Sequence, residues 1–378
     1  MAQGSIENRD GRYRARYWGP EGRQVRKTFT KKGDAQRWLN GELDAVQRGD
    51  WVDRRAGKVT FGDYATAWLA QQPHRPSTAA TTKIRLEKHV LPVLGHRPLA
   101  AVRTSEVRAL VAGLSKVLAP STVEATYRVA GVFRAAVDDR VLAATPCRNV
   151  ALPRAEGGRV EPMATDQVLA VAAAMPAHYR AAVIAAAGLG LRQGELFGLS
   201  VDRVDWLRRT VRVDRQLLGV TAGRAVFGPP KTPASVRSIP APTTVLEALT
   251  AHVRAHGEGP ERLVFSTAHG TPIRRSLAAT TWRTTADGVG LGSTTGWHEC
   301  RHYFASLLIE AGESVKVVQA RLGHKSAVET LDVYGHLWPD NEDATRAAVD
   351  RVLGGAVAAA SGGGSEGFVP LVFPEVTP

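Results

Sequence analysis

Residues 297–304, WHECRHYF, bring two histidines, a carboxylate and an arginine into one short stretch. His298, Glu299 and His302 match H-E-x-x-H, the pattern in which two histidines one helical turn apart bind zinc and the glutamate acts as a general base. The same stretch also reads as H-x-x-R-H, which pairs His298 with Arg301 and suits a phosphate group. The first interpretation predicts a zinc protease, and the second predicts a phosphoryl-transfer enzyme.

The surroundings of this stretch favour phosphate. On a helix, Cys300 and Phe304 belong to an apolar stripe, while His298, Arg301 and His302 lie together on a different face. The fixed positive charge of Arg301 repels a metal ion unless a carboxylate compensates it. A planar guanidinium instead binds two phosphate oxygens, and a neighbouring imidazole donates a further hydrogen bond or moves a proton. We therefore expect no bound metal, with the zinc protease as the alternative.

Further residues suited to phosphoryl transfer follow in the C-terminal half. Arg192 comes after a glycine-rich helix end, and Glu195 stands three residues later, where it can orient Arg192. Lys231 lies in a proline-rich turn before a predicted strand, His324 follows a glycine at a helix junction, and Tyr334 comes ten residues after His324. Each residue alone is more often structural. Together they supply cations, an imidazole and a nucleophile.

In order and approximate spacing, these residues resemble the signature of the tyrosine recombinases, in particular the phage-type integrases. The resemblance covers the C-terminal half, with weaker similarity upstream. It is carried by Arg192 with Glu195, Lys231, the run 298-HECRH-302, the run 322-LGH-324 and Tyr334. The family more often has Asp at the position of Glu299 and an aliphatic residue at the position of Cys300, and neither position contacts the phosphate in the family.

The resemblance implies a reaction. Tyr334 attacks the scissile phosphate, which forms a 3′-phosphotyrosyl linkage and frees a 5′-hydroxyl. Arg192 and Arg301 neutralise charge on the non-bridging oxygens, and Lys231 protonates the departing 5′-oxygen. Either His298 or His324 takes the proton of the tyrosine. Because the linkage stores the bond energy and the cations replace metal ions, no cofactor is expected.

Charge and composition restrict the partner. The chain of 378 residues has 49 Lys and Arg against 36 Asp and Glu, a formal net charge of +13, which favours nucleic acid over anionic lipid. It contains no apolar run of about 18 residues and no apolar signal-peptide core, so we expect a cytoplasmic, nucleoid-associated protein without a membrane partner. Two cysteines, Cys147 and Cys300, are too few for a disulfide framework.

The pattern along the chain predicts an α+β protein, mainly α with small β-sheets. Residues 1–57 predict a small sheet with one helix, and residues 1–32 contain nine basic and three acidic residues, a net charge of +6. A sheet in which Arg alternates with aromatic residues can lie in a DNA groove. The resemblance implies an arm-type DNA-binding domain. The basic residues expected to contact DNA are Arg12, Arg14, Arg16, Arg26 and Lys27.

Residues 58–148 predict a helical bundle, which the resemblance identifies with a core-binding domain. Thr60 and Ser105 are expected to begin helices, and Ser121 with Glu124 is expected to form a capping box that opens a helix over 122–142. Residues 149–164 have the composition of a linker.

Residues 165–353 predict a mixed, mostly helical catalytic domain. One strand is expected over 204–216, with a partner over 233–242. Ser326 with Glu329 is expected to form a second capping box before Tyr334. The Gly/Ser-rich residues 354–378 predict a flexible tail.

We therefore expect a site-specific DNA recombinase that integrates or excises a phage or another mobile element. Its partners are expected to be double-stranded DNA at core and arm sites, a homo-tetramer on that DNA, a directionality factor and a host DNA-bending protein. The alternatives are the zinc protease and a DNA-binding regulator without catalysis.

Overall fold

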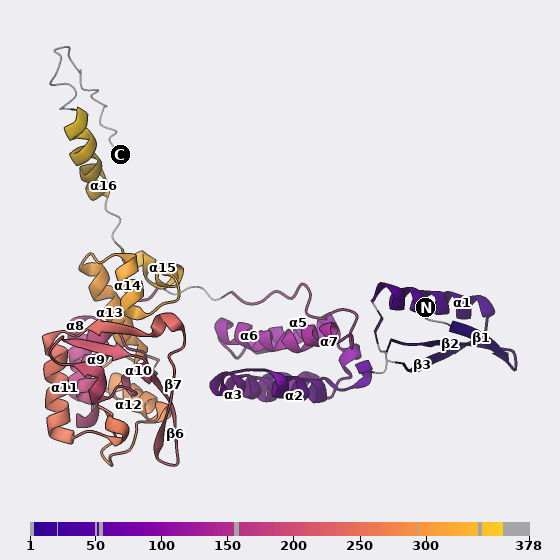
Figure 1. Cartoon of the computed structure of the whole chain (residues 1–378), viewed down its shortest axis with the longest axis horizontal. Helices are drawn as coiled ribbons and strands as arrows, with labels where there is room; N and C mark the ends of the chain where they lie inside the picture. Colours follow the sequence, from indigo (N-terminus) through magenta and orange to yellow (C-terminus); the bar gives the residue numbers. More distant parts are fainter. Residues whose placement is uncertain are drawn as a thin grey trace, which may run out of the picture. The chain divides into compact units, whose positions relative to one another are not determined.

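The computed structural model describes residues 4–20, 22–49, 51–52, 56–154, 159–292, 294–338 and 342–357. The chain forms two compact units, residues 1–158 and 159–378 (Figure 1). Both units are dominated by helices and carry only small antiparallel sheets, so the predicted fold class is confirmed. None of the helices in the described ranges is long and apolar enough to span a bilayer.

The N-terminal unit begins with a small sheet covered by one helix. Strands β1 (Gly4–Arg9), β2 (Arg12–Trp18) and β3 (Gln24–Phe29) form an antiparallel meander, and helix α1 (Lys32–Arg48) follows. Asp10 and Gly11 both have positive φ, which suits the tight turn between β1 and β2. Side chains alternate along β2, so Ala15 and Tyr17 are buried in one core with Ala35 and Leu39 of α1.

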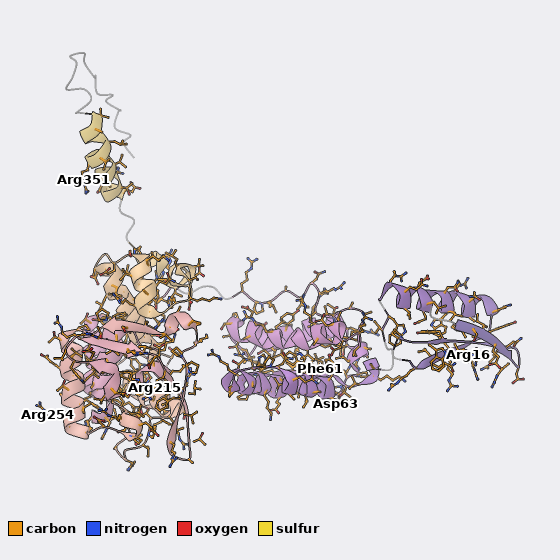
Figure 2. All side chains as sticks on the ribbon, in the orientation of Figure 1. Arg16, Phe61, Asp63, Arg215, Arg254 and Arg351 are labelled. Carbon is orange, nitrogen blue, oxygen red and sulfur yellow. The ribbon has the colours of Figure 1, made fainter. Side chains whose placement is uncertain are left out.

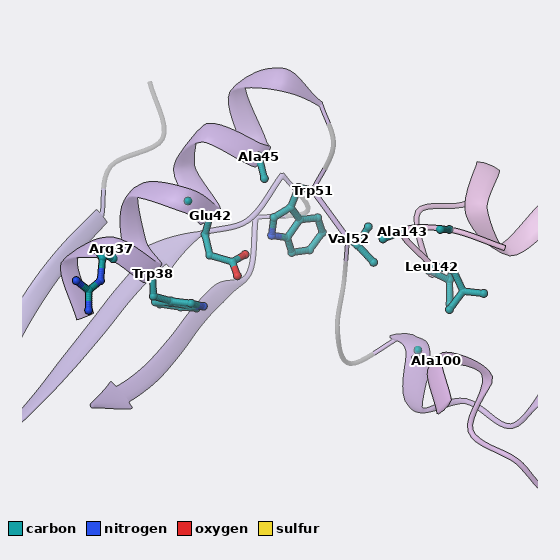
Figure 3. A pocket seen from close by; sticks show the side chains of 13 residues that line it. Arg37, Trp38, Glu42, Ala45, Trp51, Val52, Ala100, Leu142 and Ala143 are labelled. Atoms are coloured by element: carbon teal, nitrogen blue, oxygen red, sulfur yellow. The ribbon is translucent and has the colours of Figure 1, made fainter. Parts of the chain in front are cut away.

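A chain of hydrogen bonds joins α1 to this sheet. Trp51 Nε1 donates to Tyr17 Oη at 2.7 Å, and Tyr17 Oη donates to Glu42 Oε2 at 2.7 Å. Glu42 is nearly buried, so these bonds compensate the loss of water around its carboxylate. Figure 3 shows Trp38, Glu42 and Trp51 along the pocket that this side of α1 lines.

The rest of the N-terminal unit is a helical bundle with its own core. Phe61, labelled in Figure 2 at the start of α2, packs against Phe133 of α7 with ring centroids 4.8 Å apart. Thr60 begins α2 as predicted, because its hydroxyl accepts a hydrogen bond from Asp63 N. The elements are α2 (Phe61–Gln71), α3 (Pro76–Arg85), α4 (Leu91–Leu94), α5 (Thr104–Ser115), α6 (Pro120–Tyr127) and α7 (Gly131–Asp138).

Two predicted helix starts in this bundle are wrong. Helix α6 begins at Pro120, so Ser121 lies inside the helix and forms no capping box with Glu124, which pairs with Arg128 instead. Proline is preorganised for the first helical turn and lacks the N–H that a cap would satisfy. Helix α5 begins at Thr104 rather than after Ser105, because Glu106 reaches back to the backbone N–H of Arg103.

The C-terminal unit packs helices around a single large core. Helix α9 is almost entirely buried and contacts α8, α11 and α13. The helices are α8 (Thr165–Ala174), α9 (Ala177–Leu189), α10 (Gln193–Leu196), α11 (Thr243–His256), α12 (Arg275–Gly288), α13 (His298–Glu310), α14 (Val315–Leu322), α15 (Ala327–Tyr334) and α16 (Glu342–Val349). The strands are β4 (Val204–Asp205), β5 (Thr210–Val213), β6 (Gln216–Thr221), β7 (Arg224–Gly228) and β8 (Arg237–Pro240).

The strand expected over 204–216 is in fact two strands. Arg209 has a φ of +51° and turns the chain between β4 and β5. Strand β5 pairs with β8, which lies inside the predicted partner over 233–242, and a hairpin of β6 and β7 intervenes in sequence. The alternation stops at 206-WLRR-209, which forms the turn, and resumes in β5.

The regions expected to be a linker and a tail are both partly structured. Residues 149–154 and 159–164 contain no helix or strand, but Met163 is buried in the core of the C-terminal unit. The remaining linker residues, 155–158, lie outside the described residues. The helical segment that starts with α16 runs to residue 357, across the expected boundary at 354. Of the expected tail, residues 358–378 also lie outside the described residues.

A buried ion pair holds α10 against β8. Arg237 Nη2 and Glu195 Oε2 lie 2.9 Å apart, and both side chains are almost inaccessible to solvent. Arg237 Nε also donates to the carbonyl of Arg321 at 2.7 Å, which attaches α14 to the same strand. Burial alone would raise the pKa of the Glu195 carboxyl, but the charges of Arg237 and Arg192 outweigh it and hold that pKa below its usual value.

Three histidines gather elsewhere in this unit, at the start of α9 and the end of α11. The ring centroids of His178 and His256 are 4.0 Å apart, and those of His252 and His256 are 4.8 Å apart. Burial, followed by the charges of His256 and His178, lowers the pKa of His252 to about 4. The folded unit therefore holds His252 neutral at pH values where an unfolded histidine binds a proton.

Replacing Arg237 by glutamine should destabilise the C-terminal unit by about 3 kcal/mol or more, because the buried Glu195 loses a charged partner. Chemical denaturation of the full chain measures this change. Arg212→Gln is the matched control, since Arg212 pairs with Asp214, two residues later just after the end of β5, but its side chain is 68% exposed. Equal destabilisation by both variants would contradict the assigned importance of the buried pair.

Acidification should destabilise the C-terminal unit through His252. The folded pKa lies below the unfolded pKa, so this contribution to stability is complete above pH 6.5 and is lost as the pH falls towards 4. In His252→Phe, the free energy of unfolding should decline less steeply with falling pH, by up to about 1.4 kcal/mol per pH unit. His269→Phe, at an exposed histidine, should keep the wild-type slope in the same denaturation series. An unchanged slope in His252→Phe would rule out this origin.

Candidate active site

Arg192 is positioned by the sharp connection between α9 and α10. Helix α9 ends at Gly190, whose φ of +60° is left-handed, and a Cβ on Gly190 would come within 2.3 Å of Phe304. Only glycine fits both conditions. The turn places Arg192 as the N-cap of α10, where Glu195 Oε2 accepts from the backbone N–H of Arg192 at 3.0 Å.

The Arg192 guanidinium contacts three different elements. Its Nη1 donates to Glu195 Oε1 at 3.1 Å and to Ser235 Oγ at 3.2 Å, and its Nη2 donates to the carbonyl of Gly323 at 3.2 Å. Gly323 ends α14 with a φ of +66°, and a Cβ there would lie 3.0 Å from the backbone of Ser235. These contacts orient Arg192 and still leave it partly exposed, with 24% of its side chain accessible.

Arg301 is the most deeply buried cation of the site, with 1% exposure. Its Nη1 donates to the carbonyl of Gly190 at 2.8 Å and its Nη2 to the carbonyl of Leu322 at 2.7 Å. Burial, with the charge of Arg192 as the next cause, lowers the pKa of Arg301 to about 9, so the guanidinium remains charged at neutral pH. Its other N–H groups can bind an anion.

Tyr334, the last residue of α15, lies beside two histidines. Its hydroxyl is 2.9 Å from His302 Nδ1, and its ring lies parallel to that of His324 with centroids 6.4 Å apart. Tyr334 is 1% exposed. Burial raises the pKa of Tyr334 to about 12, although the nearby charges of Arg301 and Arg192 act in the opposite direction.

His324 and His298 complete the histidine cluster. His324 Nδ1 is 2.9 Å from Thr330 Oγ1, and the His298 ring is perpendicular to that of His302 with centroids 4.7 Å apart. His298 remains accessible to solvent even though protein surrounds most of its ring. Burial, followed by nearby positive charges, lowers the pKa of both His298 and His324 to about 4, so both rings are neutral at pH 7.

The predicted helix cap before Tyr334 is half right. Ser326 Oγ accepts from Glu329 N at 3.3 Å, as a capping box requires, but Glu329 Oε2 accepts from the N–H of Lys325 rather than of Ser326. The cap still fixes the start of α15 and therefore the position of Tyr334 at its end.

The structure brings together most of the residues predicted for the site. Arg192, Glu195, Arg301, His324 and Tyr334 are linked by the contacts above, and His298 joins them through His302. Lys231 lies in the turn between β7 and Ser235 with an exposed side chain, and within the described ranges it makes no hydrogen bond or ion pair with the other site residues. Its membership in the site remains a prediction.

Sequence reasoning missed three contributors. Ser235 contacts Arg192, and Arg237 pairs with Glu195. The one sequence feature that could have pointed to Ser235 and Arg237 is their position shortly after Lys231. His302 was placed only on the helix face with His298 and Arg301, and its contact with the Tyr334 hydroxyl was not foreseen. In the described part of the chain, no group of three or more His, Cys, Asp or Glu side chains is arranged to hold a metal ion.

Four of the five basic residues predicted to bind DNA share one face of the N-terminal sheet. Arg16, labelled in Figure 2, pairs with Arg26 across β2 and β3. Residues two apart on a strand point to the same side, so Arg12 and Arg14 lie with them. Lys27 pairs with the buried Ala15 and therefore lies on the α1 face, with its Nζ 5.2 Å from the Phe29 ring centroid.

Three family models match successive parts of the chain. The phage integrase N-terminal domain matches residues 3–48, the phage integrase central domain residues 61–151 and the phage integrase family residues 160–340. Together they cover nearly all of the chain that the structure describes.

Relatives and solved structures agree with these matches. An integrase assigned to prophage phiRv2 of Mycobacterium tuberculosis is 30% identical over 333 residues, covering 85% of this chain and 88% of the relative. The integrase of Mycobacterium phage L5 is 29% identical over 338 residues, covering 85% and 90% of the two chains.

Two structures share the fold at low identity. The Tn1549 transposon integrase in complex with a circular intermediate DNA has a TM-score of 0.67 and 21% identity, covering 78% of this chain and all of the other. A lambda integrase tetramer bound to a Holliday junction has a TM-score of 0.58 and 19% identity, covering 90% and 95%. The family models and the prophage relative show that the chain belongs to the phage integrase family and is a site-specific tyrosine recombinase.

Proposed function

We propose that the chain cuts and rejoins DNA through a 3′-phosphotyrosyl intermediate on Tyr334, and that it thereby integrates or excises a phage or another mobile element. The observation that carries this proposal is the arrangement around the Tyr334 hydroxyl. Two guanidiniums, Arg192 and Arg301, act on the Tyr334 hydroxyl electrostatically, and imidazoles contact its oxygen and its ring. No other tyrosine is expected to act as nucleophile.

In the proposed reaction, the Tyr334 oxygen forms a bond to phosphorus as the bond from phosphorus to the 5′-oxygen breaks. The tyrosine proton passes to a base, and Lys231 donates a proton to the departing 5′-oxygen. In rejoining, a 5′-hydroxyl attacks the phosphotyrosine, loses its proton to Lys231 and releases Tyr334, which recovers its own proton. One phosphodiester is exchanged for one phosphotyrosyl ester, so no nucleotide cofactor is required.

The charge balance of the site supports binding of a phosphodiester. Arg192 and Arg237 pair with Glu195, Arg301 adds a third guanidinium, and Glu299 is a second carboxylate that acts on Tyr334. The site therefore holds an excess of positive charge in surroundings that exclude water. Preformed cations of this kind stabilise the additional negative charge that develops on the non-bridging oxygens during transfer.

What supports a role for Lys231 is its place in the chain. Ser235, four residues later, accepts a hydrogen bond from Arg192, so the turn that carries Lys231 is attached to the site at one end. The exposed ammonium can then reach a bound phosphate without breaking an existing ion pair in the described structure. A mobile cation is suited to protonate a leaving oxygen.

We assign DNA binding to the N-terminal unit. Residues 1–57 are proposed as an arm-type domain that contacts DNA through Arg12, Arg14, Arg16 and Arg26, and residues 58–148 as the core-binding domain. Residues 149–164 form the proposed linker to the catalytic domain at 165–353. The matches to the N-terminal and central family domains support this division.

The assembly is proposed to be a homo-tetramer on two DNA sites in the bacterial cytoplasm, with a directionality factor and a host DNA-bending protein as further partners. Support for the tetramer comes from the fold shared with lambda integrase, which has been solved as a tetramer on a Holliday junction.

A covalent protein–DNA adduct should form in EDTA on a nicked suicide duplex that spans the direct repeat bordering the mobile element. Tyr334→Phe should form no adduct, because it lacks the nucleophile, while binding DNA with unchanged affinity. Denaturing gel electrophoresis measures the adduct and a mobility-shift assay measures binding. Tyr303→Phe is the matched control on α13 and should retain the adduct.

DNA that is bound but never cleaved by the wild-type chain would favour the regulator without catalysis. An adduct that persists in Tyr334→Phe would show that another residue is the nucleophile. Adduct formation that depends on a divalent metal would contradict the assigned role of the arginines.

The outer face of the N-terminal sheet should dominate arm-site binding. The double variant Arg16→Ala with Arg26→Ala should weaken binding of duplex arm-site DNA by roughly tenfold or more and reduce the slope of log affinity against log salt by about 2. The variant Lys32→Ala with Arg37→Ala removes two exposed charges from α1 and should change both quantities much less. Equal losses would indicate nonspecific attraction by net charge.

A further inference from the structure

His302 is the imidazole in hydrogen-bond contact with the nucleophile. In the part of the chain that the structure describes, the 2.9 Å contact to His302 Nδ1 is the only hydrogen bond recorded for the Tyr334 hydroxyl. His324 stacks on the tyrosine ring instead, and its Nδ1 is engaged with Thr330. His298 reaches the cluster through its ring contact with His302.

The direction of this hydrogen bond follows from burial. Tyr334 is 1% exposed, so the proton of its hydroxyl needs an acceptor within the protein. If His302 Nδ1 carried the hydrogen, the tyrosine O–H would be buried without an acceptor. The tautomer with hydrogen on Nε2 leaves Nδ1 free to accept from Tyr334, and it satisfies both groups.

The backbone fixes His302 where this contact requires it. Its neighbour Arg301 is anchored at both ends of the guanidinium, on the carbonyls of Gly190 and Leu322, so α13 cannot rotate or slide without breaking two buried hydrogen bonds. On the other side, Thr330 anchors α15 to His324 one helical turn before Tyr334.

We propose that His302 is the general base of strand cleavage, which takes the proton of Tyr334 through Nδ1 as the tyrosine oxygen attacks phosphorus and returns that proton during rejoining. This inference rests on the function proposed above. The O–H bond of Tyr334 breaks, an N–H bond forms on His302, and the phosphorus–oxygen bond to the 5′-oxygen breaks with the electron pair staying on that oxygen. Lys231 or water then protonates it.

Several charged and titratable groups lie around the pair of His302 and Tyr334. Arg301, His298 and Glu299 face it from α13, and His324 and Arg192 from the two adjoining helix junctions. The surrounding arginines disfavour a lasting imidazolium, so the proton stays on His302 only while the phosphate carries added negative charge. Burial, followed by the charge of Arg301, lowers the pKa of His302, which leaves it unprotonated at neutral pH.

Single-turnover cleavage of the suicide duplex across about pH 6 to pH 9 tests the proposal. The wild-type rate should be nearly independent of pH, because the base is already neutral. His302→Gln should cleave at least about 100-fold more slowly at pH 7, and its rate should rise nearly tenfold per pH unit, because tyrosine must then lose its proton to hydroxide. In His302→Ala, added imidazole should restore part of the rate.

His336→Gln is the matched control, since His336 is exposed and bonds only to the carbonyl of Val160 among the described residues. His298→Gln should lose rate but keep the flat pH profile. A His302→Gln profile as flat as that of the wild type, or a cleavage rate equal to it, would overturn the assignment. DNA binding and chemical denaturation identify a variant that has lost its fold, and imidazole rescue then decides the question in His302→Ala.

The two proposals fail in different ways. If the wild-type chain forms no adduct with DNA, the proposed function fails and His302 has no reaction to assist. If the wild type forms the adduct and the His302 variants cleave the suicide duplex equally fast, the proposed recombinase chemistry stands and only the assignment of the base is wrong.

Discussion

The candidate site depends on the buried guanidinium of Arg301. It joins the end of α9, the body of α13 and the end of α14, because its two terminal nitrogens donate to Gly190 and Leu322. Both carbonyls belong to helix ends, where four carbonyl groups have no partner within the helix. A charged donor satisfies them better than a neutral one does. The same contact that closes two helix ends therefore holds a positive charge in the interior.

This arrangement separates two tasks that phosphoryl transfer imposes on cations. Glu195 accepts from Arg192 and Arg237 and fixes the orientation of Arg192, while Arg301 is fixed by carbonyls and keeps its full charge without a carboxylate contact in the described residues. A second carboxylate beside Arg301 would anchor it more strongly but would cancel the field that a phosphate meets. Because backbone carbonyls rather than a carboxylate hold Arg301, its positive charge is not cancelled. Arg301 loses its surrounding water in this position, and this desolvation is the main cause of its lowered pKa.

Most of the residues singled out from the sequence lie together in the structure, whereas several of the elements around them were predicted wrongly. Residue type and order singled out Arg192, Glu195, Arg301, His324 and Tyr334. In the structure Arg192 contacts Glu195, His324 stacks on Tyr334, and Arg301 acts on Tyr334 through its charge. The helical pattern could not show that Arg301 is buried, because burial depends on the carbonyls of two segments distant in sequence. His302 was undervalued for the same reason. Its partner is 32 residues away, and only the packing of α15 on α13 brings them together.

Errors in the elements have local causes. Proline at position 120 and the carboxylate of Glu106 moved two helix starts, and Arg209 inserted a turn into an expected strand. Helix α11 was not anticipated, although it covers α9 over the core of the catalytic unit. These features depend on which of several competing local hydrogen bonds forms, and the alternatives differ in free energy by only about 1 kcal/mol.

The burial of Tyr334 has a consequence for how DNA must engage the site. A tyrosine that is 1% exposed and whose pKa is raised to about 12 is a poor nucleophile towards a phosphate that is not bound in the site. A bound phosphodiester changes this, because its oxygens replace water around Arg192 and Arg301 and bring phosphorus within reach of the tyrosine. Reactivity then depends on correct DNA placement rather than on the tyrosine alone. In the proposed reaction, a tyrosine that stays protonated and enclosed until a phosphate is bound would limit cleavage to the complete protein–DNA complex.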